Sequence, residues 1–277
     1  MKNLKSKLLE KIYEVVKDCQ KEVGIAYSSG VDSSLLTKVC LNLGKKVFLL
    51  TVGFKGSPDI ERVKEYNFGL PVFIKELDKK DVEEGIKFLI SRFEFSSLID
   101  LEISLAFYFI FKLAKEKGIK TVLSANGLDE LFCGYRKYKK ILEKGRGELE
   151  EAIKSDIKKA REINERNRKI AKFFGVNFIE PFLDEKFVEF ALKIPLEYKI
   201  KSPKDKIRKH LTREIAFELG VPKEIAFRKK KSMQYSSRID KAIEKLAKEK
   251  GITKFKARKM GFLGVKEAYV KSLKNSS

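Results

Sequence analysis

The sequence predicts an α/β fold in which a twisted parallel sheet carries helices on both faces and a helical C-terminal part follows. Two observations lead to this class. Short apolar runs alternate with segments of helical period through the first half of the chain, and from about residue 136 the pattern becomes mainly helical. Strands and helices in regular alternation are typical of a parallel sheet that is covered on both sides.

Four short apolar runs are the predicted strands: EVGIAYS (22–28), KKVFLLTVGF (45–54), LPVFIKEL (70–77) and IKTVLSAN (119–126). The segments predicted as helices between them are 33–44, 59–67, 79–93 and 100–117, and residues 1–17 also have an amphipathic helical pattern. Ligands of such sheets bind beyond the carboxyl ends of the strands. We therefore expect the polar motifs at 28–33, 52–59 and 124–129 to converge on one cleft.

The second half of the chain is predicted to be helical. Apolar residues recur at helical spacing at Leu149, Ile153, Ile157 and Ala160, with charges between them. EPFLDEKFVEFALKIP and KIRKHLTREIAFELG follow as two further amphipathic helices with their lead-in loops. Residues 236–277 form a basic helical tail, which either packs on the core or contacts a polyanion. The chain is expected to be one domain.

The composition excludes several classes of protein. Cys19, Cys40 and Cys133 are odd in number and have no metal-ligand spacing, and His210 is the lone histidine. No apolar run reaches the roughly 18 residues of a membrane span, and the first residues lack the apolar centre of a signal peptide. We expect a cytoplasmic protein. Abundant Lys, Glu and Ile beside only two glutamines resembles the residue usage of thermophilic proteins.

The formal net charge of +22 has two interpretations, to which we give equal weight. One is a lysine-rich solvated surface, and the other is a surface that faces RNA or DNA. The excess gathers at residues 136–140, 228–231 and 248–259. No recognisable nucleic-acid-binding module accompanies these clusters.

SSGVDSSLL (28–36) is predicted to be a phosphate loop that leads into a helix. The start of that helix presents free N–H groups and the positive end of its dipole to a bound anion. Gly30 allows the backbone to approach an anion closely, and the serine hydroxyls add donors. The chain has no GxxxxGK[ST], so the loop is not the common P-loop.

The loop resembles SGGxDS, the pyrophosphate loop of the N-type ATP pyrophosphatases, with Ser29 in place of the first glycine. TVGFKGSPD, LSANGLDELFCGYRKY, FFGVNFIEPFLDEKF, KHLTREIAFE and FRKK follow in the order seen in the synthetase domain of asparagine synthetase B and its β-lactam synthetase relatives. This similarity runs from about residue 20 to residue 235. It implies an adenine nucleotide alpha hydrolase-like fold and an enzyme that uses ATP and magnesium.

The resemblance implies a role for particular residues on the ATP side. Ser28, Ser29, Gly30, Asp32 and Ser33 would hold pyrophosphate, and Asp32 and Asp129 would be the magnesium carboxylates. Adenine would lie against the strand ends, at Ala26, Val52, Gly53, Ser124 and Ala125. Lys209 would stabilise charge at the α-phosphate, with Arg228 and Lys230 as the basic pair beside it. Such fixed cations often supply several kcal/mol of transition-state stabilisation.

The chain departs from the family pattern on the acceptor side. SGEG of the family is SANG here, so Asn126 replaces a glutamate, and ExRxPFLD is NFIEPFLD, so Asn177 replaces a glutamate and Ile179 an arginine. An asparagine cannot act as a base. Asn126 and Asn177 are therefore expected to contact a substrate other than aspartate, and Glu180, beside them, is expected to be a solvated loop charge.

The resemblance implies an ATP-dependent amide ligase that forms an acyl-adenylate and releases AMP and pyrophosphate. The sequence starts Met1, Lys2, Asn3 rather than with the cysteine nucleophile of a glutaminase domain, so we expect free ammonia, a separate glutaminase subunit or an amine on the substrate to be the nitrogen donor. One alternative is an enzyme that adenylates a tRNA base, which the net charge of +22 and Cys133 favour. Cys133 is expected to be a small buried residue in a helix rather than a sulfur carrier. A binding protein that has lost turnover is the weakest interpretation.

Overall fold

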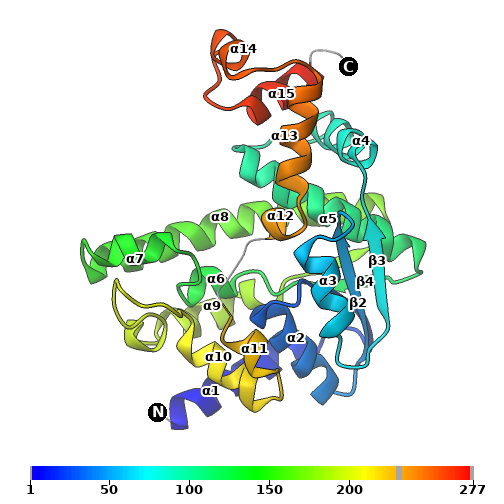
Figure 1. Ribbon diagram of the computed structural model, residues 1–277. Helices are drawn as coiled ribbons and strands as arrows, with labels where there is room; N and C mark the ends of the chain where they lie inside the picture. The colour runs from blue at the N-terminus through cyan, green and yellow to red at the C-terminus, as the bar shows by residue number, and fades with distance from the viewer. Residues whose placement is uncertain (1, 229–232, 275–277) are drawn as a thin grey trace.

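The computed structural model describes residues 2–228 and 233–274. Its centre is a five-stranded sheet of order β3-β2-β1-β4-β5, in which every neighbouring pair is parallel (Figure 1). The strands are β1 (Glu22–Ala26), β2 (Lys46–Gly53), β3 (Val72–Glu76), β4 (Thr121–Leu123) and β5 (Asn177–Ile179). The predicted fold class is confirmed, and all four predicted strands are present.

The second half is mainly helical, as predicted, and it adds one short strand, β5, that was not predicted. β5 is only three residues long, and the apolar run that contains it, FFGVNFI (173–179), begins at the last residue of the long helix α8. It forms because the register of β4 continues onto it, with Val122 opposite Phe178 and Leu123 opposite Ile179. A strand this short takes its conformation from its neighbour in the sheet rather than from its own sequence.

The helices of the first half alternate with the strands as predicted, with bounds that differ by a few residues. They are α1 (Lys2–Lys17), α2 (Val31–Asn42), α3 (Pro58–Glu65), α4 (Lys79–Ile90) and α5 (Leu98–Glu116). α4 begins with a capping box between Asp78 and Asp81, and the Ser97 side chain caps α5.

The later helices are α6 (Leu128–Leu131), α7 (Lys137–Leu142), α8 (Arg146–Phe173), α9 (Glu185–Leu192), α10 (His210–Glu218), α11 (Lys223–Ala226), α12 (Met233–Ser236), α13 (Ile239–Glu249), α14 (Lys254–Lys259) and α15 (Val265–Lys274), with short 3-10 turns at Pro181–Leu183 and Leu196–Tyr198. Leu149, Ile153 and Ile157 face the core from α8, as their spacing predicted. None of the helices among the described residues combines the length and apolar character needed to cross a bilayer.

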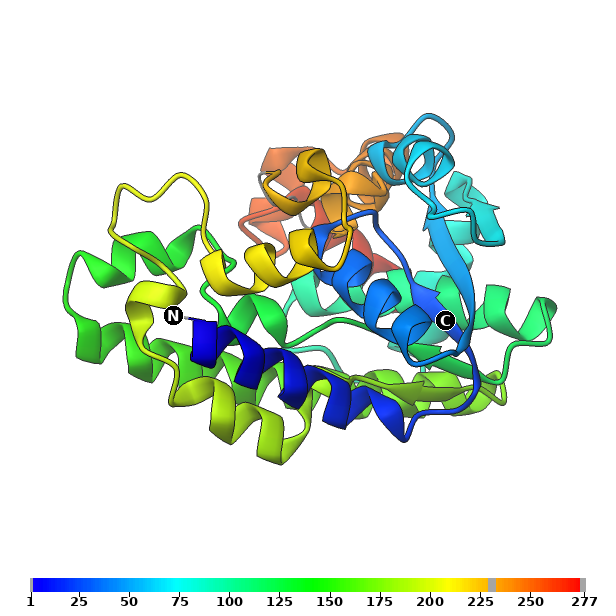
Figure 2. The ribbon, with the colours of Figure 1, turned by 90° about the horizontal axis from the view of Figure 1, so that it is seen from below.

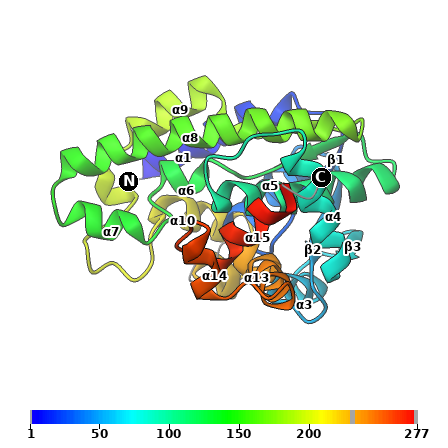
Figure 3. The same ribbon diagram turned by 90° about the horizontal axis from the view of Figure 1, so that it is seen from above.

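The sheet separates two hydrophobic cores, because successive residues of a strand point to opposite faces. Leu49 and Leu123 belong to one core, with α1, α2 and α10, and Leu50 and Val122 belong to the other, with α4, α5 and α13. Figure 2 shows α1 and α2, in blue, beside the yellow helix α10. Figure 3 shows α13 and α15, in orange and red, beside α4.

The basic segment after residue 236 packs on the core. Ile239, Ile243 and Leu246 are buried on one face of α13, and Tyr269 of α15 is fully buried and donates a hydrogen bond to Glu83 at 2.9 Å. The backbone of this segment also contacts the residue after β2, since Phe54 N donates to Ser237 O at 3.0 Å. We considered packing on the core or contact with a polyanion for this segment, and the structure shows that it packs on the core.

Replacing Ile243 with alanine should lower the free energy of unfolding by about 2–5 kcal/mol, because it removes a fully buried side chain from the second core. Urea denaturation of the whole chain measures this. Lys241→Ala, at an exposed position of the same helix, is the control and should change stability little. Equal stability of the two variants would show that α13 does not contribute to the core.

Candidate active site

The predicted phosphate loop connects β1 to α2 and has an unusual backbone. Ser29 has φ 52°, in the left-handed region, whereas Gly30 is extended with φ −84°. The similar motif has glycine at the position of Ser29, which is the residue type that adopts this conformation without strain. Gly30 contributes space instead, because a Cβ there would meet only Ser28 Oγ, at 3.2 Å.

The start of α2 is available to an anion. Within the described structure no side chain caps this helix, so no capping side chain accepts a hydrogen bond from the N–H groups of its first turn. Ser33 Oγ braces the loop by donating to Gly30 O at 3.2 Å, and it lies 3.4 Å from Ser28 N. The uncapped helix start and the helix dipole together favour a phosphate or carboxylate at this point.

A pocket of about 130 Å³ opens over this helix start, and three arginines line it. Its lining consists of Ser28, Gly30, Val31, Asp32, Ser33, Asp59, Arg62, Arg213, Ile225 and Arg228. Arginine is well suited to bind phosphate through several hydrogen bonds. The pocket therefore combines the serine loop with three positive side chains from elements far apart in the sequence.

Each arginine is held by a defined partner. Arg62 Nη2 lies 2.9 Å from Asp59 Oδ1, and the buried Asp59 accepts a hydrogen bond from Ser236 at 2.7 Å. Arg228 Nη2 donates to Ser29 O at 2.5 Å, and Arg213 Nη1 donates to Arg228 O at 3.0 Å. Burial lowers the pKa of Arg228 and of Arg213. Arg62 and Arg213 were not predicted, although each belongs to or adjoins a motif that was.

The centre of the site is an ion cluster of Lys209, Asp32 and Asp129. Lys209 Nζ lies 2.5 Å from Asp32 Oδ2 and 2.5 Å from Asp129 Oδ1, and its side chain is only 1% exposed. Burial lowers the pKa of Lys209, and Asp32 opposes that change. These three side chains come from α2, α6 and the residue that precedes α10, so the structure brings together three of the predicted site residues.

Gly134 packs against this cluster and was not predicted as a site residue. A Cβ at Gly134 would lie 1.8 Å from Asp129 Oδ1 and 2.3 Å from Lys209 Cε. The carbonyl of Gly134 accepts from Arg208 Nη2 at 2.9 Å. Its presence in the FCGYRKY motif was the available signal, and close packing explains why glycine is needed there.

Cys133 is buried, as expected, but it lies in a turn rather than in a helix. α6 ends at Leu131, and Cys133 has φ 58°, a left-handed conformation that the glycine of the family motif adopts readily. Burial raises the pKa of the thiol to about 12. The thiol therefore stays protonated near neutral pH, which makes it a poor nucleophile.

The residues predicted to lie beside adenine are at the carboxyl ends of three neighbouring strands. Ala26 ends β1, Val52 and Gly53 end β2, and Ser124 and Ala125 follow β4. Gly53 is covered by the chain before α13, since its Cβ would lie 3.3 Å from Ser237 Cα. The adenine contacts themselves remain a prediction.

The acceptor-side residues separate in the structure. Asn177 is exposed at the amino end of β5, opposite Thr121, whereas the phosphate loop lies at the carboxyl ends of the strands. Asn126 follows β4 and donates through Nδ2 to Glu180 Oε1. The prediction that Glu180 is solvated is wrong, because its side chain is buried against the loop after β4. Lys230 lies outside the described residues.

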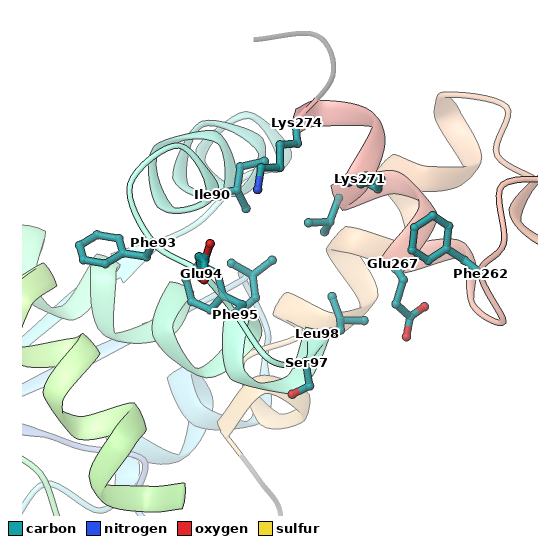
Figure 4. A pocket seen from close by; sticks show the side chains of 12 residues that line it. Ile90, Phe93, Glu94, Phe95, Ser97, Leu98, Phe262, Glu267, Lys271 and Lys274 are labelled. Carbon is teal, nitrogen blue, oxygen red and sulfur yellow. The ribbon is translucent and has the colours of Figure 1, made fainter.

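A second pocket, of about 380 Å³, opens between the loop that joins α4 to α5 and the helix α15 (Figure 4). Phe95 and Leu98 face it from one side, and Phe262 and Lys271 from the other. Its lining includes none of the candidate site residues. It is a largely apolar groove rather than part of the ion cluster.

The fold places the serine loop, three arginines and the ion cluster at the carboxyl edge of a parallel sheet. A family model described as asparagine synthase matches residues 7–173 and 142–273. The chain belongs to the asparagine synthase family. The resemblance found in the motifs is thereby confirmed.

Similar proteins include synthetases from archaea and plants. A Methanocaldococcus jannaschii protein assigned as a glutamine-hydrolysing asparagine synthetase is 31% identical over 285 residues, covering 91% of this chain and 51% of the relative. Glutamine-hydrolysing asparagine synthetase 2 of Oryza sativa subsp. japonica is 32% identical over 247 residues, covering 80% of this chain and 41% of the relative. The chain thus spans about half the length, or less, of these relatives.

Two solved structures are similar at low identity. NMN synthetase from Francisella tularensis has a TM-score of 0.42 and 13% identity, covering 100% of this chain and 93% of that chain. A U34-tRNA thiolase from Methanococcus maripaludis has a TM-score of 0.40 and 13% identity, covering 98% and 78%. Likeness at this level supports no conclusion about the site.

Lys209→Met should lower the free energy of unfolding by about 3–5 kcal/mol, because it leaves the largely buried carboxylates of Asp32 and Asp129 without their cation. Chemical denaturation at neutral pH measures the loss. The control is Lys206→Met, an exposed lysine of the same loop, which should be nearly neutral. A similar stability for both variants would contradict the buried ion cluster.

Gly134→Ala should destabilise the chain and disturb the cluster, since the added methyl group would overlap Asp129 and Lys209. Gly147→Ala is the matched control, because Gly147 lies in the first turn of α8 with open space around its Cβ. That change should be neutral or stabilise by up to about 1 kcal/mol. Thermal unfolding distinguishes the two, and a neutral Gly134→Ala would show that the glycine is not tightly packed.

Proposed function

We propose that this protein is an ATP-dependent ligase that activates a carboxylate as its acyl-adenylate, releases pyrophosphate and then forms an amide. One observation carries the proposal. Lys209 Nζ lies 2.5 Å from an oxygen of Asp32 and 2.5 Å from an oxygen of Asp129, beside the arginine-lined pocket, although 177 positions separate Asp32 from Lys209. An ion cluster that desolvates three charges costs stability, and a nucleotide site accounts for that cost.

The β- and γ-phosphates would occupy the arginine-lined pocket. There the start of α2 supplies N–H donors, Ser28 and Ser33 supply hydroxyls, and Arg62, Arg213 and Arg228 supply positive charge. Because these groups are fixed by their partners before the ligand arrives, they need little reorganisation to stabilise departing pyrophosphate.

Asp32 and Asp129 fit a magnesium ion, since their oxygens converge on the ammonium group of Lys209 and so lie close together. Magnesium is commonly held by one or two carboxylates plus substrate phosphates. No group of three or more His, Cys, Asp or Glu side chains in the described part of the chain suits a metal by itself. When bound there, magnesium would neutralise charge on the phosphates.

The first step would join the substrate carboxylate to the α-phosphorus and break the bond from that phosphorus to pyrophosphate. Lys209 lies beside the start of α2, where it would stabilise the charge that builds up on the α-phosphate. In the second step an amine would attack the activated carbonyl carbon, and the bond to AMP would break. Adenine would rest at Ala26, Val52 and Ser124.

The acceptor and the nitrogen donor belong to the proposal in a general form only. A small-molecule carboxylate is the acceptor, and aspartate is the first to test because of the family. Ammonia, or an amine delivered by a separate glutaminase, is the donor. Asn126 would lie on the acceptor side, whereas Asn177, at the far end of β5, is no longer proposed to contact the substrate.

A tRNA base as the adenylated group is the second candidate, and one surface feature favours it. A groove of about 880 Å³ runs along α13, where Lys241, Lys245 and Lys248 recur on one side and Lys55 and Lys79 lie opposite. This groove adjoins Phe54, next to the end of β2. A groove lined by five lysines suits a phosphate backbone, and Asp78 and Glu249 are the acidic residues in its lining.

The first experiment measures pyrophosphate release from ATP and magnesium with aspartate plus ammonia. Wild-type protein should release pyrophosphate, and Asp32→Ala should reduce the rate at least 100-fold, because it removes a carboxylate of the cluster. Asp18→Ala, at an exposed position after α1, is the control. Absence of release with aspartate and with other carboxylates would overturn the ligase proposal.

A parallel reaction with bulk tRNA tests the second candidate. Release that depends on tRNA should fall by orders of magnitude between about 50 and 200 mM salt, since phosphate contacts are lost as counterions compete. Release with a small carboxylate should change little over the same range. Salt-independent release with tRNA absent would exclude RNA as the acceptor.

A further inference from the structure

Glu180 is a buried carboxyl group, and one of its oxygens has no hydrogen-bond partner in the part of the chain that the structure describes. The residue directly follows β5 and is only 3% exposed. Oε1 accepts a hydrogen bond from Asn126 Nδ2, whereas Oε2 is buried and has no hydrogen-bond partner among the described residues. An unpaired buried polar atom costs free energy, so it calls for a function.

The position of this carboxyl is fixed by two loops that pack closely. Ser124 N donates to Ile179 O at 3.1 Å, and a Cβ at Gly127 would lie 2.9 Å from Phe182 O. The loop that carries Asn126 continues directly into α6, which holds Asp129. Glu180 is therefore hydrogen-bonded to a residue that lies three positions before Asp129 of the ion cluster.

The charges around Glu180 leave it poised to exchange a proton. Burial raises its pKa to about 8, and the hydrogen bond from Asn126 acts in the opposite direction. Arg168 on α8 also lowers the pKa, and Glu130 on α6 raises it. An acid whose pKa lies near the working pH is an effective proton acceptor.

We infer that Glu180 binds the nitrogen nucleophile through Oε2 and accepts the proton that this nitrogen loses when the amide forms. The inference rests on the proposed ligase function. Ammonia or a primary amine is the matching ligand, because it supplies the N–H donor that Oε2 lacks. Asn126 holds Oε1, so the two side chains act as one unit.

The step balances in atoms and charge. The nitrogen lone pair attacks the carbonyl carbon of the acyl-adenylate, and a C–N bond forms. The C–O bond to AMP breaks, and AMP leaves with that electron pair. The nitrogen proton passes to Glu180 Oε2, which returns it to water when the product leaves.

The test separates the two half-reactions in Glu180→Gln, which keeps the shape and an oxygen for Asn126 but cannot accept the proton. Exchange of labelled pyrophosphate into ATP, driven by aspartate or another carboxylate, should stay within about twofold of wild type. Amide formation with ammonium should fall about 100-fold or more, which is the usual contribution of an acid–base group. Glu185→Gln, at an exposed position five residues on, should change neither.

The outcomes distinguish this inference from the proposed function. Normal amide formation by Glu180→Gln, with exchange intact, would overturn the role of Glu180 and leave the ligase function standing. No exchange by wild type with any carboxylate would reject the ligase function, and the inference with it. A wild-type amide rate that rises with pH through about 8, and loses that rise in Glu180→Gln, would support the role.

Stability provides a measurement that does not depend on turnover. Because the folded-state pKa of Glu180 is raised from 4.5 to about 8, its contribution to stability is complete below pH 4.5 and is lost as the pH rises to about 8. Glutamine does not ionise. The Tm of Glu180→Gln relative to wild type should therefore increase between pH 5 and pH 9, and a constant difference would overturn the inference.

Discussion

The burial of one lysine between two carboxylates is the constraint on which this structure depends. Lys209 is removed from water, so both of its partners must be in place whenever the chain is folded. This requirement ties α2 to α6 and to the start of α10, and it explains the special backbone around the cluster. Lys209 itself is left-handed, with φ 62°, and Gly134 leaves no side chain between the ions.

The arginine pocket follows from the same arrangement. Arg213 lies one turn after Lys209 and holds the backbone of Arg228, which in turn donates to Ser29 in the phosphate loop. The loop, the cluster and the C-terminal half of the chain thus form one connected network.

The sequence predicted much of this molecule because its strongest signals are local. Alternating apolar runs gave four of the five strands, and the SSGVDSS loop, Asp129 and Lys209 were found from motifs. The sequence could not give β5, whose three residues depend on pairing with β4. Nor could the sequence predict the burial of Glu180. A glutamate beside a proline is usually solvated, and this one is buried because the loop after β4 packs over it. Arg62 and Gly134 were missed because their places beside the phosphate loop and Lys209 depend on the folding of distant segments onto each other.

The wide separation of the cluster residues in the sequence affects the order in which the site can form during synthesis on the ribosome. Asp32 is made early, but its partner Lys209 follows 177 residues later, and Ser236, which binds Asp59, later still. Sheet strands β1 to β4 can pair before those segments emerge, whereas the site cannot close. The contacts of Lys209 with Asp32 and Asp129 can therefore form only after the last quarter of the chain has begun to emerge from the ribosome.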